Sequence, residues 1–271
     1  MPFVAILGAG PLGGALASGL AASGRFDELR LIDPEKTVAS GKALDILQAA
    51  PVEGTATRLS GSATLDAAGG AWVSVLADPA GSTAPDLART LALVRDLHRR
   101  SPQAVLICAN TSHHLLMARA VATGAIAPDR VVGSAPLAFA SAARALIALD
   151  ADVSPSQVLV HVATVGPALG RPPCAVQWER SSIGGDRASE CLTHEQRARI
   201  ERRLARSWPT GPVTLAAAAA QFTEAAWFGA RTPLPGWWVD NGGVAPPDVH
   251  LLRFAPGGRV SMTRASTGAG R

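Results

Sequence analysis

The clearest indication of the fold is the segment Phe3-Val-Ala-Ile-Leu-Gly8-Ala-Gly10-Pro-Leu-Gly13 near the start of the chain. An apolar run ends in a glycine-rich turn, and a stretch of small residues follows, as expected for a strand, a tight turn and a helix. A second apolar run, Leu29-Arg-Leu-Ile-Asp33, ends in an acid. The order strand, turn, helix, strand is typical of a β-α-β unit in a parallel sheet.

Each glycine of this turn has a physical role if the ligand is a dinucleotide. We expect Gly8 to allow the sharp turn, Gly10 to let a pyrophosphate approach the backbone, and Gly13 to let the helix lie close to the strand. The helix N-terminus offers unpaired N–H groups to the phosphates. Asp33 lies 20 residues after Gly13, where a carboxylate accepts both ribose hydroxyls, so the pattern favours NAD over NADP. The alternative is a tight turn without a ligand.

The composition sets wider limits on fold and partners. A length of 271 residues allows one large or two modest domains with a sizeable core. The chain is 48% hydrophobic but only 4% aromatic and has no Tyr, so the core must consist mainly of Ala, Leu and Val. The net charge is +4, but the basic residues are scattered, which does not predict a nucleic-acid partner.

Neither the apolar runs nor the cysteines indicate a membrane segment or a metal site. No apolar run approaches the ~20 residues of a membrane span, and the first residues lack a leader pattern, so we expect a cytoplasmic protein without a membrane partner. Cys108, Cys174 and Cys191 are far apart and show no metal-ligand spacing. We therefore predict no metal site and interpret the three thiols as buried or incidental.

Strands and helices alternate through the first half of the chain. The predicted helices cover 12–23, 38–50, 86–100 and 112–123. After the first two strands, the predicted strands cover 56–60, 72–77, 104–109 and 130–134. This alternation predicts an α/β fold with a Rossmann-type, doubly wound parallel sheet.

The pattern changes after Pro136, and we predict a second, smaller α/β domain there. Its predicted helices cover 138–149, 194–207 and 214–228, and its strands cover 157–165, 174–179, 237–240, 249–254 and 259–263. Thr193-His-Glu-Gln196 matches a capping box, and residues 266–271 are predicted to be disordered. The predicted domains are therefore residues 1–136, which bind the cofactor, and residues 137–271.

The order of motifs resembles the lactate/malate dehydrogenase family over roughly residues 1 to 260. Besides the glycine turn, the motifs are Gly41-Lys-Ala-Leu-Asp-Ile-Leu-Gln-Ala-Ala-Pro51, Arg130-Val-Val-Gly-Ser134, Ser141-Ala-Ala-Arg144, Val153-Ser-Pro155 and Ile183-Gly-Gly185. The resemblance implies that the first half binds NAD and the second half closes the substrate site. It also implies hydride transfer between the nicotinamide and a small 2-hydroxy or 2-oxo acid.

The resemblance also implies roles for single residues. Arg144 would grip the substrate carboxylate through two parallel hydrogen bonds, and Asn110, at the end of the fifth strand, would contribute to catalysis and to cofactor binding. The backbone near Ala77 would cover the adenosine. Family members pair through the helix that matches Gly41–Ala50, so we expect a homodimer or a dimer of dimers.

The chain departs from the family pattern where the proton transfer takes place. The family's Asp falls at Ser141, no Arg stands between Ala80 and Asp86, and the segment expected to hold the catalytic His reads Val162-Ala-Thr-Val-Gly-Pro-Ala-Leu-Gly170. The chain also stops soon after Thr263, where family members continue into a long C-terminal helix, so we expect the second domain to be shortened.

Three histidines near the expected site are open to two interpretations. His161 is a displaced proton carrier or a half-buried strand histidine, because a one-residue shift of register turns a side chain to the other face. His113 and His114, which follow Asn110, face the nicotinamide pocket or stand at a helix start.

The catalytic candidates are therefore Arg144, Asn110 and His161. The cofactor-binding candidates are Gly8, Gly10, Gly13, Asp33, Ala77 and Asn110. Two functions remain open: an active NAD-dependent oxidoreductase on a small 2-oxo or 2-hydroxy acid, or a non-catalytic NAD-binding relative that serves as a sensor, partner subunit or scaffold. The resemblance favours the first function, because most members of the family are enzymes. The residues favour the second, because losing the acid–base group typically costs 10²- to 10⁴-fold in rate.

Overall fold

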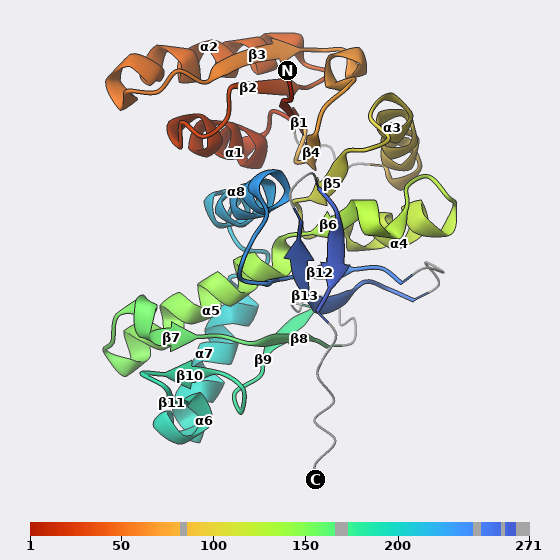
Figure 1. The fold of residues 1–271 in the computed structure, drawn as a ribbon. Coiled ribbons are helices and arrows are strands. Elements are labelled where there is room, and N and C mark those ends of the chain that lie inside the picture. Colours follow the sequence, from red (N-terminus) through yellow and green to blue (C-terminus); the bar gives the residue numbers. More distant parts are fainter. Residues whose placement is uncertain (82–85, 166–172, 241–244, 256–257, 264–271) are drawn as a thin grey trace.

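The computed structural model describes residues 1–81, 86–165, 173–240, 245–255 and 258–263. Their centre is one nine-stranded sheet in the order β14-β13-β12-β6-β5-β4-β1-β2-β3 (Figure 1). Its strands are β1 (Val4–Leu7), β2 (Glu28–Ile32), β3 (Arg58–Ser62), β4 (Val73–Leu76), β5 (Val105–Cys108), β6 (Val131–Gly133), β12 (Leu234–Trp238), β13 (Asp248–Phe254) and β14 (Val260–Met262).

The six strands from β1 to β6 are parallel, and helices cover both faces of the sheet. Figure 1 shows α1, α2 and α8 on one side and α3 and α4 on the other. The helices are α1 (Pro11–Ala22), α2 (Lys36–Glu53), α3 (Leu87–Arg100), α4 (His113–Ala122), α5 (Ala135–Ala151), α6 (Ala188–Cys191), α7 (His194–Arg206) and α8 (Pro212–Phe228). The Rossmann-type, doubly wound sheet predicted from the sequence is thus confirmed.

Prolines account for the main differences in helix bounds. Pro51, expected to end the second helix, lies inside α2, which continues to Glu53 and ends at Gly54, a left-handed residue with φ of 69°. Pro136, expected to precede a helix, stands in the first turn of α5, where its missing N–H breaks no intrahelical hydrogen bond.

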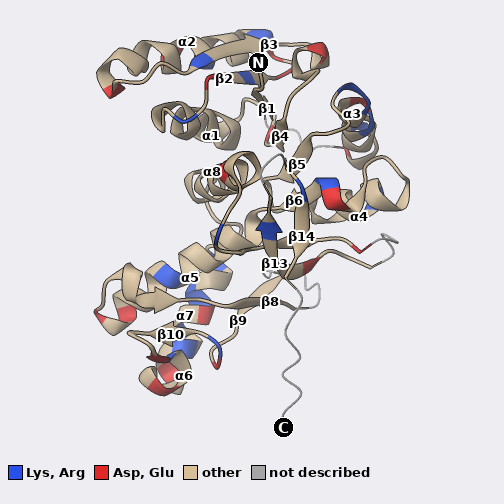
Figure 2. Cartoon of the chain, in the orientation of Figure 1, with Lys and Arg blue, Asp and Glu red and all other residues tan. Residues whose placement is uncertain are grey.

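A smaller layer follows α5. It contains β7 (Val158–Leu159), β8 (Val162–Thr164), β9 (Cys174–Val176), β10 (Ser182–Ile183) and β11 (Asp186–Arg187). The strands β8 and β9 pair antiparallel, as the sequence predicts, and the Thr193–Gln196 capping box opens α7. Arg199 of α7 donates to Asp150 of α5 at 2.9 Å, within a mixture of acids and bases that Figure 2 shows on this layer. Phe139, Ile147, Val158, Ile200 and Leu204 belong to a separate core of this layer.

The last strands and α8 return to the large sheet. Trp237 of β12 stands antiparallel to Gly133 of β6, and Phe222 of α8 is buried in the large core. The core of the smaller layer therefore lies within residues 139–204, between two segments that build the large sheet. Segments on both sides of residue 136 contribute to the large core, so the two cores do not correspond to two consecutive parts of the chain. The domain boundary at residue 136 stays a prediction.

The contact between β6 and β12 leaves no room for a side chain at Gly133. A Cβ there would lie 2.7 Å from Cε3 of Trp237 and 3.1 Å from Sδ of Met117, both buried side chains. We predict that Gly133→Ala lowers the free energy of unfolding by about 1–3 kcal/mol through overpacking.

Gly19 in α1 is the matched control, because a Cβ there meets nothing within 4 Å. Gly19→Ala should raise the free energy of unfolding by about 0.5–1 kcal/mol, since alanine favours the helix. Urea denaturation of both variants measures the difference. Equal stability of the two variants would contradict the proposed close contact between β6 and β12.

Candidate active site

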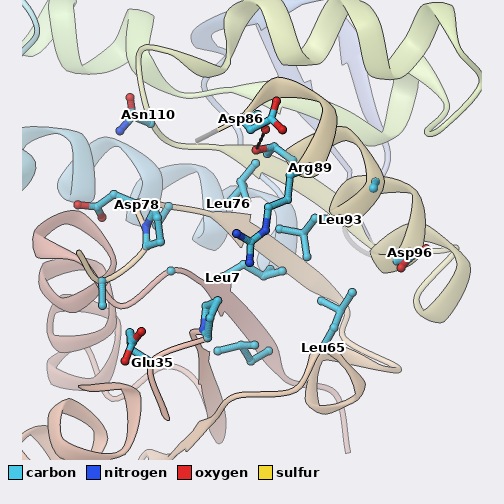
Figure 3. A pocket seen from close by; sticks show the side chains of 18 of the residues that line it. Leu7, Glu35, Leu65, Leu76, Asp78, Asp86, Arg89, Leu93, Asp96 and Asn110 are labelled. Atoms are coloured by element: carbon cyan, nitrogen blue, oxygen red, sulfur yellow. Dashed lines mark hydrogen bonds between the residues drawn. The ribbon is translucent and has the colours of Figure 1, made fainter. Parts of the chain in front are cut away.

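A cavity of about 710 Å³ opens at the carboxyl ends of β1, β4 and β5 (Figure 3). This edge lies where the chain crosses from one side of the sheet to the other, which is the usual ligand site of open α/β sheets. Its apolar walls include Leu7, Ile32, Leu65, Leu76 and Leu93. Its polar and charged lining consists of Glu35, Asp78, Asp86, Arg89, Thr90, Asp96, Asn110 and His113.

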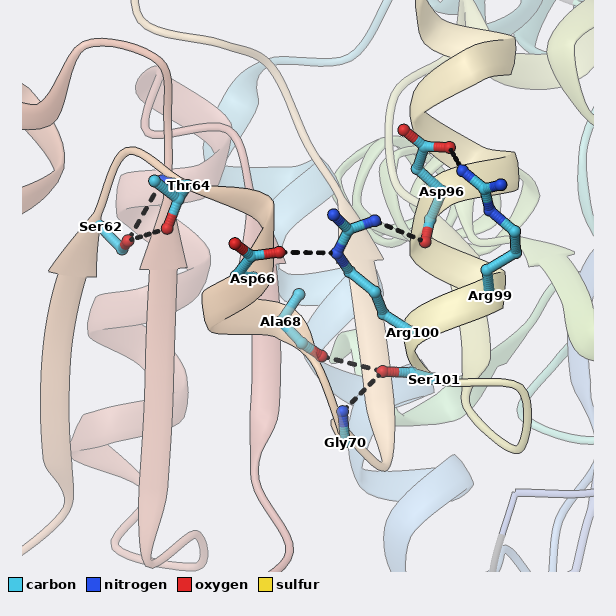
Figure 4. Close-up of polar contacts among 9 residues, drawn as sticks. All are labelled: Ser62, Thr64, Asp66, Ala68, Gly70, Asp96, Arg99, Arg100 and Ser101. Carbon is cyan, nitrogen blue, oxygen red and sulfur yellow. Dashed lines mark hydrogen bonds and ion pairs between the residues drawn. The ribbon is translucent and has the colours of Figure 1, made fainter.

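The outer wall of the cavity is held in place by hydrogen bonds to the end of α3 (Figure 4). Ser101 Oγ donates to Ala68 O at 2.9 Å and accepts from Gly70 N at 3.0 Å. Arg100 Nε pairs with Asp66 at 2.9 Å. These contacts fix α3, which carries Arg89 and Leu93, against the short turn that carries Leu65. In Figure 3 the Arg89 side chain reaches into the cavity beside Leu93.

Two glycines of the predicted cofactor turn are required by the fold itself. Gly8 has φ of 111°, and a Cβ there would lie 2.3 Å from Asp78 O. A Cβ on Gly13 would lie 1.9 Å from Gly8 O, so the first turn of α1 could not rest on the end of β1. Gly8 and Ala77 border the cavity, whereas Gly10 and Gly13 do not.

Asp33 is fully buried and ties three loops together. Its Oδ2 accepts from Ala9 N and from Ala80 N, each at 2.7 Å, and its Oδ1 accepts from Glu35 N at 2.9 Å. The carboxylate thus joins the glycine turn, the loop after β4 and the start of α2. It does not border the cavity, so its contact with a ribose stays a prediction.

Asp78 is a site residue that the sequence analysis missed. Its Oδ1 accepts from Leu12 N and Gly13 N, each at 3.0 Å, and so caps the first turn of α1. The N-cap of that helix, Gly10, has no side chain to do this, and the carboxylate also opposes the positive end of the helix. The available signal was an acid directly after the strand end at Ala77, at the ligand edge of a parallel sheet.

Asn110 and His113 both border the cavity and contact each other. Asn110 N donates to His113 Nδ1 at 3.3 Å, which places the proton of the neutral ring on Nε2. Burial lowers the pKa of His113 to about 4, so the ring is neutral near pH 7. His114 lies beside it, with its ring centroid 5.7 Å from that of Trp237 and its Nδ1 3.2 Å from Thr111 O.

Arg144, on α5, and His161, between β7 and β8, do not border the cavity. Arg144 Nε donates to Val158 O at 2.8 Å, which ties α5 to β7. His161 N donates to Ser181 Oγ at 3.0 Å. The pKa of the His161 ring is lowered, mainly by burial and to a smaller extent by the positive charge of Arg180. The structure therefore does not bring these two catalytic candidates to Asn110.

Several predicted features lie outside the described residues or away from the cavity. Residues 82–85 of the loop without an Arg, residues 166–170 of the expected His segment and the terminus 266–271 lie outside the described residues. Cys108 and Cys174 are buried, and Cys191 is exposed. In the described ranges, no cluster of His, Cys, Asp or Glu is placed to hold a metal ion, and no helix has the length and apolarity that a membrane crossing needs.

The lowered pKa of His113 makes stability depend on pH. The unfolded chain binds a proton near pH 6.5, whereas the folded chain does so only near pH 4. Between these values the unfolded state holds more protons, so the stability present above pH 6.5 is lost as the pH falls. We predict that the free energy of unfolding of His113→Gln falls less over this pH range than that of the unchanged protein, by up to roughly 3 kcal/mol.

Urea denaturation at pH 7 and pH 4.5 measures the effect of His113→Gln. His194→Gln is the control, because His194 lies exposed at the start of α7. That variant should keep the pH dependence of the unchanged protein. The same steep loss of stability in His113→Gln would show that His113 is not the buried neutral group.

Comparisons with known proteins agree with the architecture. No family model matches the chain. The malate dehydrogenase of Thermomicrobium roseum is 35% identical over 172 residues, which are 60% of this chain and 55% of that protein. The malate dehydrogenase of Thioalkalivibrio sulfidiphilus is 30% identical over 213 residues, which are 75% of this chain and 68% of that protein. The chain spans about half the length of the first of these relatives.

Solved structures share the fold over nearly the whole chain. The malate dehydrogenase from Salinibacter ruber has a TM-score of 0.83 at 21% identity, covering 98% of this chain and 90% of that one. A lactate dehydrogenase from Cryptosporidium parvum, complexed with lactic acid and nicotinamide adenine dinucleotide, has a TM-score of 0.83 at 21% identity, covering 98% and 91%. Together with the sequence relatives, these comparisons show that the chain belongs to the lactate/malate dehydrogenase family.

Proposed function

We propose that this chain is an NAD(H)-linked oxidoreductase that acts on a small 2-hydroxy or 2-oxo acid. The observation that carries the proposal is the β1-α1-β2 unit, which opens onto a 710 Å³ cavity at the carboxyl edge of the parallel sheet. Membership of the lactate/malate dehydrogenase family supports the reaction class. The bound cofactor would supply a hydride to a 2-oxo acid, or accept one from a 2-hydroxy acid, at its nicotinamide ring.

The described residues of the cavity fit the planar base of this cofactor but leave no free backbone donors for its pyrophosphate. The apolar walls at Leu7, Leu65 and Leu93 suit a planar base. The pyrophosphate does not fit in the present arrangement, because the Asp78 carboxylate accepts the N–H groups of Leu12 and Gly13 at the start of α1. His113 offers a hydrogen-bond donor at Nε2 and not an acid, because its pKa of about 4 leaves it neutral near pH 7.

A second candidate function is a non-catalytic, dinucleotide-binding relative that acts as a sensor, partner subunit or scaffold. One observation favours it: neither Arg144 nor His161 borders the cavity. The guanidinium of Arg144 is engaged with Val158 O instead. Ser141, which stands where the family has an Asp, cannot hold a catalytic histidine by charge.

We also propose a cytoplasmic homodimer, or a dimer of dimers, that pairs through α2. The side chains of Leu44 and Leu47 on this helix are 56% and 38% exposed, and burial of apolar side chains drives such pairing. We predict that light scattering gives the mass of a dimer or tetramer and that Leu44→Glu with Leu47→Glu shifts it to the 27.7 kDa monomer. A monomer in the unchanged protein at high concentration would contradict this pairing.

Oxidation of NADH with a panel of 2-oxo acids tests the activity. We predict turnover with at least one acid, at a rate below the ordinary enzyme range of about 1–10³ per second, since the usual acid–base group is not in place. Calorimetric titration with NADH is run in parallel. Binding without oxidation of NADH would support the non-catalytic alternative, and absence of both would contradict the proposed cofactor.

The Arg144→Lys variant separates two roles for Arg144 in the same assay. If Arg144 grips the substrate carboxylate, the KM for the acid rises sharply, because an ammonium cannot supply two parallel hydrogen bonds. If Arg144 only ties α5 to β7, the variant loses stability and keeps the KM.

A further inference from the structure

We propose that Asp78 is a built-in competitor for the phosphates of the cofactor. In this state the cleft binds a phosphate-free nucleoside about as tightly as the corresponding dinucleotide, and a pyrophosphate enters only when the Asp78 side chain turns away. The inference rests on the proposed function, because it concerns the same cleft. Asp78 would thus determine whether the phosphates, or only the nucleoside, contribute to the binding affinity.

The N–H groups at the glycine turn already have acceptors. Gly8 N donates to Ile32 O at 2.8 Å, Gly10 N to Asp78 O at 2.9 Å, and Gly14 N to Gly10 O at 2.9 Å. Ala9 N donates to Asp33. Leu12 N and Gly13 N both donate to Asp78 Oδ1, and Pro11 has no N–H. A pyrophosphate could therefore bind these groups only by displacing a carboxylate.

The space beside Gly10 is already occupied by Asp78. A Cβ at this position would lie 2.5 Å from both Cγ and Oδ2 of Asp78. The close approach that glycine permits here is therefore used by the Asp78 side chain. Because a carboxylate and a phosphate seek the same donors and the same positive helix end, the two compete for one place.

The charge around this place is mostly negative. Glu35, Asp86 and Asp96 also border the cavity, and Asp33 is buried. On the basic side, Lys42 Nζ donates to Gly10 O at 3.0 Å, and Arg89 lines the cavity. The acids outnumber these cations, so the surroundings do not favour adding the two charges of a pyrophosphate.

The competition is reversible because only the side chain of Asp78 has to move. The backbone of Asp78 is held by its own carbonyl, which accepts from Gly10 N. The residue is half-buried at the cavity wall, and Figure 3 shows its carboxylate at the edge of the cavity. A rotation of the side chain would free Leu12 N and Gly13 N without rearranging the strand.

Calorimetric titration with adenosine, ADP-ribose and NADH tests the inference on the full chain. For the unchanged protein we expect adenosine and ADP-ribose to bind within about threefold of each other. Asp78→Gly should raise the affinity for ADP-ribose and NADH by about tenfold or more, because two donors become available to a charged acceptor. The affinity of this variant for adenosine should stay within about threefold of that of the unchanged protein. Asp78→Asn keeps the shape but weakens the acceptor, so an intermediate gain is expected.

Asp86→Gly is the matched control. Asp86 borders the same cavity and caps a different helix, because its Oδ1 accepts from Ala88 N at 3.0 Å. This variant removes one of the acids around the cavity without freeing the N–H groups of α1, so ADP-ribose should bind more tightly by less than about threefold, well below the gain expected from Asp78→Gly. Circular dichroism of all variants shows that each is folded before it is titrated.

The results separate this inference from the proposed function. Binding of ADP-ribose to the unchanged protein at least tenfold tighter than adenosine would overturn the inference. The inference would also be overturned if neither Asp78→Gly nor Asp78→Asn binds ADP-ribose more tightly than the unchanged protein does, or if neither variant binds it at all. Tighter binding in Asp78→Gly, with no NADH oxidation by the unchanged protein, would keep the inference and contradict the oxidoreductase.

Discussion

Two carboxylates, Asp33 and Asp78, hold the ligand edge of this fold together by accepting backbone N–H groups of the glycine turn. The start of a helix leaves several N–H groups without partners inside the helix. Asp33 takes the N–H of Ala9 and joins it to Ala80 and Glu35, and Asp78 takes those of Leu12 and Gly13. The ends of β1, β2 and β4 are thereby fixed to the first turn of α1.

The same interaction constrains the function. In a dinucleotide site the helix N-terminus serves the ligand, whereas in this chain it serves the protein's own Asp78. The protein thus gains a capped helix at the expense of an open anion site. The smaller layer adds a second difference, because Arg144 ties α5 to β7 and is not directed into the cavity.

The local sequence contains much of the fold and less of the site. The apolar runs around Val73 and Val105 and the glycine turn predict the parallel sheet, because their periodicity is local. The return of β12 to pair beside Gly133 could not be predicted, since that contact joins residues about one hundred positions apart. Asp78 was missed because its partners, Leu12 and Gly13, come from a distant turn. The role of Arg144 in holding the substrate carboxylate comes from a motif and stays a prediction, because a motif does not specify on which side of α5 the side chain lies.

A crystal structure of the protein with ADP-ribose would show directly whether Asp78 and the pyrophosphate compete for the start of α1. We expect the Asp78 side chain to have turned away from α1 and the pyrophosphate to accept hydrogen bonds from Leu12 N and Gly13 N. The base should lie against the apolar wall at Leu65 and Leu93. A pyrophosphate bound at the glycine turn while Asp78 Oδ1 still accepts from both N–H groups would show that the two do not compete.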